Sequence, residues 1–194
     1  MSIERVNSFL NSEELDDDAI KYMTDAENAI RIQNASFTWQ RNGQPNLKDI
    51  NLEVPHGKLI AIVGSVGSGK SSLLSGILGD MEKLNGTINI DGKIAFVPQQ
   101  AWVQNDTLRK NVTFATPFNE KRYKQVIRTC CLEPDINMLS GGDQTEIGER
   151  GINLSGGQKQ RISLARAVYS NASIYLLDDP LRLVQCSYYA IVKS

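Results

Sequence analysis

Residues 64–72 read Gly64-Ser65-Val66-Gly67-Ser68-Gly69-Lys70-Ser71-Ser72, and this stretch decides the fold. The apolar residues 59–63 before it predict a short strand, and residues 73–78 after it predict a helix that ends at Gly79. The glycines let the backbone curl so that successive N–H groups point into one concavity, and the start of the helix makes that concavity more positive. Strand, glycine-rich turn and helix in this order predict a loop that binds a polyphosphate.

Two side chains at the end of this stretch have the chemistry that such a loop needs. Lys70 is predicted to place its charge on the β and γ phosphates, and the Ser71 hydroxyl to take one position on a magnesium ion. The alternative is a glycine-rich turn with an exposed lysine. The strand and helix predicted on either side favour the phosphate loop.

Two later stretches carry polar groups suited to the same chemistry. Residues 154–158 read Leu154-Ser155-Gly156-Gly157-Gln158 and lead into an apolar-faced helix, so their N–H groups predict a second anion site. Residues 174–177 predict a buried strand that ends in Asp178 and Asp179. In a protein with a phosphate loop, the first acid after such a strand would hold magnesium, directly or through water.

The length and the charge of the chain limit the classes of protein to which it can belong. A chain of 194 residues with 41% hydrophobic residues can bury one globular core and a small second lobe. Its formal net charge of −1 offers no basic field, so no nucleic-acid partner is predicted. No apolar run approaches the roughly 20 residues that span a bilayer. The 3 cysteines lack CxxC spacing and are interpreted as reduced thiols.

The first 28 residues differ in pattern from the rest. Ile3, Val6, Phe9 and Leu10 predict one helical stripe, and an acidic stretch follows at residues 13–18. We interpret residues 1–28 as a linker. It either joins the chain to something upstream or is a solvated tail.

From residue 29 onward the pattern becomes that of a mixed α/β protein. Residues 30–39 and 50–54 alternate between apolar and polar types and predict antiparallel strands with one buried face. Trp39 ends the first of them, either as a packed edge residue or as a platform for a nucleotide base. Asn-Gly and Asp-Gly pairs predict a further strand pair, residues 87–90 with 93–97.

Two more features follow that strand pair. Gln99 comes directly after the strand predicted at residues 93–97, where an active-site residue of an α/β sheet would project. Residues 120–131 predict a helix capped by Asn119, with its apolar residues at helical spacing. We interpret that helix as ordinary core packing.

Taken in order, the phosphate loop, Gln99, residues 154–158 and the Asp178-Asp179 pair resemble the nucleotide-binding domain of an ATP-binding cassette (ABC) transporter. Residues 97–102 (Val-Pro-Gln-Gln-Ala-Trp) and 145–151 (Thr-Glu-Ile-Gly-Glu-Arg-Gly) are similar to the first such domain of multidrug resistance-associated exporters. The resemblance implies a P-loop NTPase core with an antiparallel β subdomain and a helical signature subdomain, its C-terminal part missing. The implied boundaries are a linker at 1–28, an incomplete domain at 29–181 and a divergent tail at 182–194.

The resemblance implies a role for each of these residues, with ATP and Mg²⁺ as cofactors. Trp39 would stack on adenine, and Gln99 would sense the metal and the attacking water while touching the membrane-spanning domain. Asp178 would support the metal together with Ser71 and Gln99. The implied ATP-binding set is Trp39, Gly64, Ser65, Val66, Gly67, Ser68, Gly69, Lys70, Ser71 and Ser72.

The same resemblance implies partners. Leu154, Ser155, Gly156, Gly157 and Gln158 would close over ATP held by a second nucleotide-binding domain, with two nucleotides sandwiched head to tail. Residues 145–151 would lie near the interface with the membrane-spanning domains of an exporter. The domain would therefore work at the cytoplasmic face of a membrane, whereas the chain by itself would be cytosolic.

Two departures from the family pattern bear on activity. Asp179 stands where hydrolytic members usually have glutamate, as general base or to position the water, and a misplacement of about 1 Å can cost on the order of 100-fold in rate. From Arg182 onward the family pattern stops, and the switch histidine is absent because the single histidine, His56, precedes the loop. We therefore expect weak hydrolysis and, with a sheet left incomplete, a weakened domain.

These departures leave two functions open. One is the ATP-binding domain of an exporter, which couples ATP binding and hydrolysis to transport. The other is a truncated or splice-derived fragment that binds nucleotide without hydrolysing it and has a regulatory role or none. A soluble phosphate-loop kinase is disfavoured because the sequence shows no substrate lid or base for one.

Overall fold

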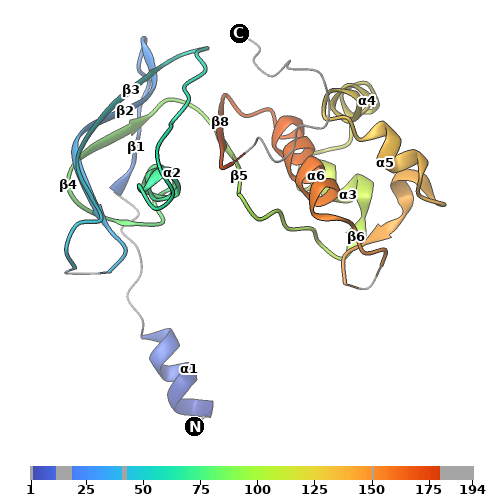
Figure 1. Cartoon of the computed structure of the whole chain (residues 1–194), viewed down its shortest axis with the longest axis horizontal. Helices are drawn as coiled ribbons and strands as arrows, with labels where there is room; N and C mark the ends of the chain where they lie inside the picture. The colour runs from blue at the N-terminus through green and yellow to red at the C-terminus, as the bar shows by residue number, and fades with distance from the viewer. Residues whose placement is uncertain (1, 12–18, 41–42, 150, 180–194) are drawn as a thin grey trace. The chain divides into compact units, whose positions relative to one another are not determined.

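The computed structural model describes residues 2–11, 19–40, 43–149 and 151–179 of the chain (Figure 1). These residues form two compact units, Met1–Asp91 and Gly92–Ser194. Both contain strands and helices, so the predicted α/β class is confirmed. The acidic stretch at 13–18 and the tail at 182–194 lie outside the described residues.

The first unit is built on one sheet. Its strands are β1 (Lys21–Tyr22), β2 (Asn28–Thr38), β3 (Leu47–Pro55) and β4 (Glu82–Ile90), in the order β1-β4-β2-β3. β2 pairs antiparallel with both β3 and β4, which confirms the predicted antiparallel strands, and β1 adds a parallel edge. β2 is therefore a central strand, flanked on both sides.

The core of this unit packs around β2. Ile30, Ile32, Phe37 and Ile88 are each at most 2% exposed. The predicted single buried face is wrong for β2, because residues 28–30 and 35–38 are all buried and successive side chains of a strand point to opposite faces. Helix α2 (Lys70–Leu78) ends at Gly79, which adopts the left-handed conformation as its C-cap, as predicted.

Gly86 of β4 lies where β4 and β2 come closest and where their register changes. The register of the two strands shifts between Gln33 and Ser36, and Gly86 has a φ of 79° at this place. A Cβ there would lie 2.5 Å from the Cα of Ala35, so only glycine allows the strands to approach this closely. The Asn-Gly pair thus lies within β4, opposite a bulge in β2, rather than at the start of a strand.

The predicted pairing of residues 87–90 with 93–97 is wrong. Both segments are strands, but β4 already has β1 on one side and β2 on the other. With both edges taken, β4 offers no free row of N–H and C=O groups to β5 (Ile94–Val97). β5 pairs instead with β8 (Ile174–Leu177), and the two run parallel.

The strand predicted at residues 59–63 is also wrong for the part of the chain that the structure describes. Residues 58–65 are irregular, and Leu59 and Val63 are 77% and 88% exposed. A strand exists only where a neighbour accepts and donates its backbone hydrogen bonds, and no described strand pairs with this segment.

The second unit is mainly helical. Its helices are α3 (Leu108–Thr113), α4 (Glu120–Thr129), α5 (Glu133–Asn137) and α6 (Gly156–Tyr169). α4 begins at the predicted cap, since the Asn119 side chain accepts a hydrogen bond from the Arg122 N–H. A short 3-10 helix (Gly142–Gln144) and the small pair β6 (Asp106–Thr107) and β7 (Glu146–Ile147) complete it.

Helix α6 forms the centre of this second core. It packs against α3, α4 and β5, and its Ile162, Ala165 and Tyr169 are fully buried. The Tyr169 hydroxyl, although buried, donates to the carbonyl of Pro117 at 2.9 Å and accepts from the Asn119 N–H at 2.7 Å. The buried hydroxyl of Tyr169 therefore has both a donor and an acceptor as partners.

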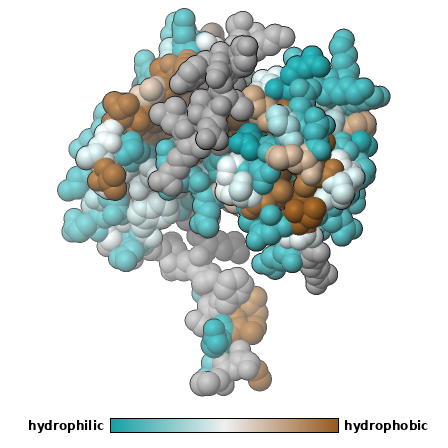
Figure 2. All heavy atoms as spheres, turned by 45° about the vertical axis from the view of Figure 1, so that its right-hand side comes forward, coloured by the Kyte–Doolittle hydropathy of each residue, from teal (hydrophilic) through white to brown (hydrophobic). Residues whose placement is uncertain are grey.

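The N-terminal helix α1 (Ser2–Leu10) confirms the predicted helical stripe near the start of the chain. Its apolar residues Ile3, Val6 and Leu10 are 84%, 56% and 74% exposed, and apolar residues appear at the surface of this helix in Figure 2. Among the described residues, no helix is both long and apolar enough to cross a membrane.

Candidate functional site

The loop before α2 has the backbone that a bound anion requires. Gly67 and Gly69 have φ angles of 80° and 91°, in the left-handed region that glycine occupies at little cost. Gly69 is also the N-cap of α2, and no side chain caps this helix start. A glycine at this position has no side chain with which to cap the helix, and the helix dipole makes this end of α2 positive.

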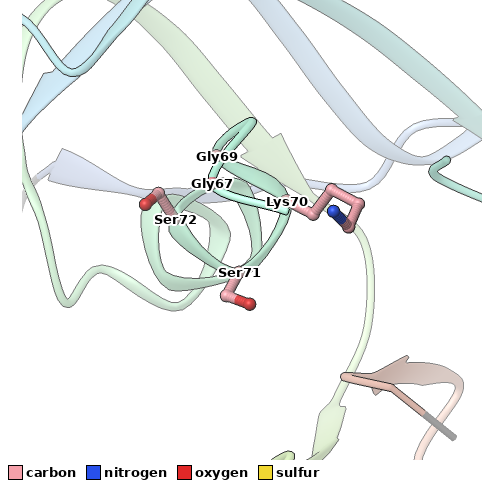
Figure 3. A pocket seen from close by; sticks show the side chains of 5 residues that line it. All are labelled: Gly67, Gly69, Lys70, Ser71 and Ser72. Atoms are coloured by element: carbon pink, nitrogen blue, oxygen red, sulfur yellow. The ribbon is translucent and has the colours of Figure 1, made fainter. Parts of the chain in front are cut away.

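These residues line a hollow of about 200 Å³ in the first unit. Its lining is Gly67, Gly69, Lys70, Ser71 and Ser72, which all belong to the predicted phosphate loop. Figure 3 shows the side chains of Lys70, Ser71 and Ser72 leaving the start of α2 in different directions. Backbone N–H groups, one ammonium and two hydroxyls are a donor set that fits a polyphosphate and its magnesium ion.

Lys70 is held by the loop itself. Its Nζ donates to the carbonyl oxygens of Gly64 at 3.0 Å and Ser65 at 2.7 Å. An ammonium group has three protons, so these two bonds fix its place while one proton remains for a further acceptor. The charge is therefore positioned beside the hollow before any anion arrives.

Trp39 lies next to the same loop. It follows the end of β2, is 51% exposed, and its indole Nε1 donates to Ser72 Oγ at 3.3 Å. Its backbone N–H donates to Asn46 Oδ1 at 2.9 Å. The structure thus brings together Trp39 and Ser72, two members of the predicted ATP-binding set, with much of the indole open to solvent.

A second group of predicted residues meets in the second unit, where β5 and β8 run parallel. Because Val97 pairs with Leu177, the residues that follow both strands emerge at the same edge of the sheet. Gln99 Nε2 donates to Asp179 Oδ2 at 3.4 Å, and the N–H of Asp178 donates to the carbonyl of Val97 at 3.0 Å. Both predicted catalytic residues are therefore in contact.

The backbone at Asp179 adopts the left-handed conformation. Its φ of 51° lies in a region that aspartate and asparagine enter more readily than other residues with a Cβ. This conformation directly after β8 accompanies the contact with Gln99.

Residues 154–158, which we call the signature segment, begin α6. Leu154 is buried, 7% exposed, and anchors the segment, whereas Ser155 and the two glycines are exposed. Ser155 Oγ accepts from the Gln158 N–H at 3.3 Å, and Gln158 Oε1 accepts from the Ser155 N–H at 2.9 Å. This reciprocal capping box orders the helix start that the sequence predicts as an anion site.

A cluster around Arg166 of α6 is not predicted by the sequence pattern. The Arg166 guanidinium lies 3.9 Å from the centre of the Trp102 ring and 5.4 Å from that of Phe114, and both rings are about half exposed. Burial lowers the pKa of Arg166 to about 10, which leaves it charged at pH 7. An arginine in the middle of the apolar side of a predicted helix was the available signal.

The β-sheet with its phosphate loop and the helical unit with its capped signature segment define an α/β protein of the phosphate-loop class. The sequence profile described as "ABC transporter" matches residues 47–182, which is well over half of the chain. This chain therefore belongs to the ABC transporter family.

Individual relatives agree with this assignment. The chain is 55% identical over 185 residues to ATP-binding cassette sub-family C member 3 of Rattus norvegicus and 54% identical over 184 residues to sub-family C member 2 of Homo sapiens. It is 52% identical over 185 residues to ABC transporter C family member 8 of Dictyostelium discoideum. Each match covers 95% of this chain and 12% of the relative, so the chain spans about an eighth of these proteins.

Proposed function

We propose that this chain is the ATP-binding domain of an exporter of the multidrug resistance-associated type, and that it couples ATP binding and hydrolysis to transport across a membrane. The observation that carries the proposal is the glycine loop at the uncapped start of α2, with Lys70 held beside the hollow. The similarity to sub-family C members supports the kind of transporter.

In this proposal the loop grips the phosphates of the nucleotide. Backbone N–H groups of the loop and of the first turn of α2 donate to phosphate oxygens, and Lys70 adds a point charge. Ser71, Gln99 and Asp178 are the residues assigned to the magnesium ion. A magnesium ion, when bound, neutralises charge that develops on the phosphates.

The remaining residues serve recognition and partners. Trp39 offers an indole face to adenine, since half of it is open to solvent beside Ser72. Ser155, Gly156, Gly157 and Gln158 are assigned to ATP held by a second nucleotide-binding domain. Closure of the two domains over their nucleotides would then move the membrane-spanning domains.

Titration with MgATP tests the proposal. In a Trp102→Phe background, which leaves Trp39 as the single tryptophan, we expect MgATP to quench its fluorescence and to release or absorb heat in calorimetry. Lys70→Ala should abolish both signals, because Lys70 is the one ammonium group among the described residues that line the hollow. Lys58→Ala, an exposed lysine outside the hollow, is the matched control and should bind like the parent.

An unchanged response in Lys70→Ala would remove Lys70 from this role. No heat at millimolar ATP with folded chain would contradict the proposed function as a whole. A circular dichroism spectrum of each variant separates loss of binding from loss of fold.

A second candidate function is nucleotide binding with little or no hydrolysis, and Asp179 favours it. Its carboxylate is one methylene shorter than the glutamate of the resembling hydrolytic members and already accepts a hydrogen bond from Gln99. We expect steady-state turnover well below the range of about 1–1,000 s⁻¹ of ordinary enzymes. Asp179→Glu should raise it, whereas a Lys70-dependent rate of about 1 s⁻¹ or more in the unaltered chain would contradict this candidate.

A further inference from the structure

Asp135 of α5 is a buried carboxylate that the proposed function does not use. The residue is 5% exposed. Arg161 of α6 donates to it twice, from Nε to Oδ2 at 2.7 Å and from Nη2 to Oδ1 at 2.9 Å. A planar guanidinium paired in this way fixes geometry as well as charge. The second turn of α6 is therefore clamped to α5.

The same carboxylate also contacts the signature segment. Gln158 Nε2 donates to Asp135 Oδ1 at 3.3 Å, while Gln158 Oε1 accepts from the Ser155 N–H at 2.9 Å. A carboxylate only accepts and a backbone N–H only donates, so a single orientation of the Gln158 amide satisfies both. Asp135 thus selects the orientation that closes the capping box at the start of α6.

We propose that Asp135 is a positioning residue for the signature segment. Through Gln158 and Arg161 it keeps the Ser155 hydroxyl and the first N–H groups of α6 in the arrangement that meets the phosphate of a nucleotide held by a partner domain. The functional part of this inference rests on the proposed function, because only that proposal assigns the signature segment to a partner's nucleotide. The positioning itself is a property of this chain and is tested separately.

The charge of Asp135 matters as much as its shape. In Asp135→Asn, one oxygen remains, and at the Oδ1 position it still accepts from Arg161 Nη2 and Gln158 Nε2. The new NH₂ group then faces Arg161 Nε, and two donors facing each other in a buried place leave that hydrogen bond unmade. We therefore expect Asp135→Asn to weaken the clamp on Arg161 and, through it, to loosen the start of α6 even where the fold is kept.

A compensating change exists at Gln158. In Gln158→Glu, one oxygen still accepts from the Ser155 N–H, because glutamate serves a capping box as well as glutamine does. Its second oxygen repels Asp135 but accepts from the amide of an asparagine at 135. Each single variant should therefore weaken the cap, and the double variant Asp135→Asn/Gln158→Glu should restore it.

Amide hydrogen exchange in the 194-residue chain measures this directly. We expect exchange of the N–H groups of Ser155 and Gln158 to speed up roughly five- to tenfold in each single variant, since one net hydrogen bond is lost, and to return toward the parent rate in the double variant. Asp143→Asn is the matched control, because it breaks another bidentate pair with arginine in the same unit, Arg109–Asp143 at 2.8 and 3.0 Å. It should lower the melting temperature without changing exchange at the signature segment.

Unchanged exchange in both single variants, or a double variant no better than either single one, would overturn the positioning role. The two single variants make the test robust, because Gln158→Glu reports on the same contact if Asp135→Asn does not fold. Equal effects of Asp143→Asn at these amides would also overturn it, since general loosening would then explain the result.

Association in MgATP tests the functional part, with a second copy of the chain as the probe partner. Sedimentation should show MgATP-dependent pairing of the parent, weakened in Asp135→Asn and restored in the double variant, while the Trp39 response to MgATP stays unchanged throughout. Equal pairing of the parent and Asp135→Asn would overturn the functional part. A parent that binds MgATP but never pairs would count against the proposed partner arrangement, and the exchange result would still decide the positioning role.

Discussion

Arg166 carries a charge on the otherwise apolar side of α6, and the side chain is tied down at several points. Its Nε donates to the Asn111 carbonyl at 2.8 Å and its Nη2 to Asn111 Oδ1 at 3.2 Å, while its planar face covers the Trp102 ring. Asn111 is fully buried, so its acceptors have no water to replace this partner. Arg166 therefore uses both its planar face, which stacks on Trp102, and its separate N–H donors, which bind Asn111.

Arg166→Lys should therefore destabilise the chain by about 2 kcal/mol, although the charge is kept. Lysine reaches only one of these acceptors and loses the stacked contact with Trp102. Urea unfolding measures the change. Arg128→Lys is the matched control, because Arg128 is exposed on α4 and pairs with Glu133 only at 3.5 Å, and it should change stability by less than about 0.5 kcal/mol. Equal stability of Arg166→Lys and the parent would show that the fork and the stacking contribute little.

At the scale of elements, the end of α4 uses a residue that does not suit its conformation. The N–H of Leu132 donates to the carbonyl of Ile127 at 2.9 Å and that of Cys131 to Arg128 at 3.1 Å, which is the Schellman arrangement. Cys131 has a φ of 54° there, a conformation that favours glycine. The neighbouring Cys130 is buried, and burial raises the pKa of its thiol to about 12.

Cys131→Gly should stabilise the chain by about 1 kcal/mol, because glycine removes the steric cost of the left-handed conformation. Thermal or urea unfolding with Cys130 kept reduced gives the measurement. The end of α6 provides a comparison: Asn171 has a φ of 55°, and because asparagine tolerates this conformation, Asn171→Gly should gain only a few tenths of a kcal/mol. A loss of stability in Cys131→Gly would mean that the cysteine side chain contributes packing that outweighs the strain.

For the molecule as a whole, the informative segment is residues 59–63. They are apolar and rich in β-branched residues, yet the described structure leaves Leu59, Ile60 and Val63 exposed and without a paired strand. A short apolar segment with high β-propensity and unpaired backbone is prone to association. The stability of the rest comes from the two separate cores around β2 and α6.

Hydrogen exchange should separate this segment from those cores. We expect the amides of residues 59–63 to exchange at close to the rate of an unstructured peptide, because no described strand pairs with their backbone groups. Amides of Ile30, Ile32 and Ile88, in paired and buried strands, should be protected. Strong protection of residues 59–63 at low protein concentration would contradict the described arrangement, and protection that appears only as concentration rises would indicate association.

Local signals in the sequence predicted the helix starts and ends well. The glycine at 79 and the asparagine at 119 each cap a helix as predicted, because a cap depends on residues within one turn. The serine at 155 also caps its helix, whereas the N–H groups at this helix start were expected to be unpaired. Partner choice between strands depends on distant residues instead. That is why the pairing predicted for 87–90 and 93–97 and the strand predicted at 59–63 were wrong.

In the candidate site, too, local features were predictable from the sequence and contacts between distant residues were not. The sequence identified Gln99 and Asp179 separately, but their contact follows from the parallel pairing of β5 with β8, which no local pattern encodes. Asp135 and Arg161 were not predicted at all, because a charged pair across two helices appears only when the helices are packed. Roles at the phosphate loop, the signature segment and Asp178 stay predictions.

The short strand β1 has a practical consequence for work with this protein. Lys21 and Tyr22 lie alongside Asn89 and Ile90 of β4, and the nearby Ala19 is only 6% exposed. Trimming the chain back to residue 29 would strip the cover from one border of the four-stranded sheet and leave its outermost backbone groups bare to solvent. Shortened versions should therefore begin ahead of residue 19, so that β1 still covers the edge of β4.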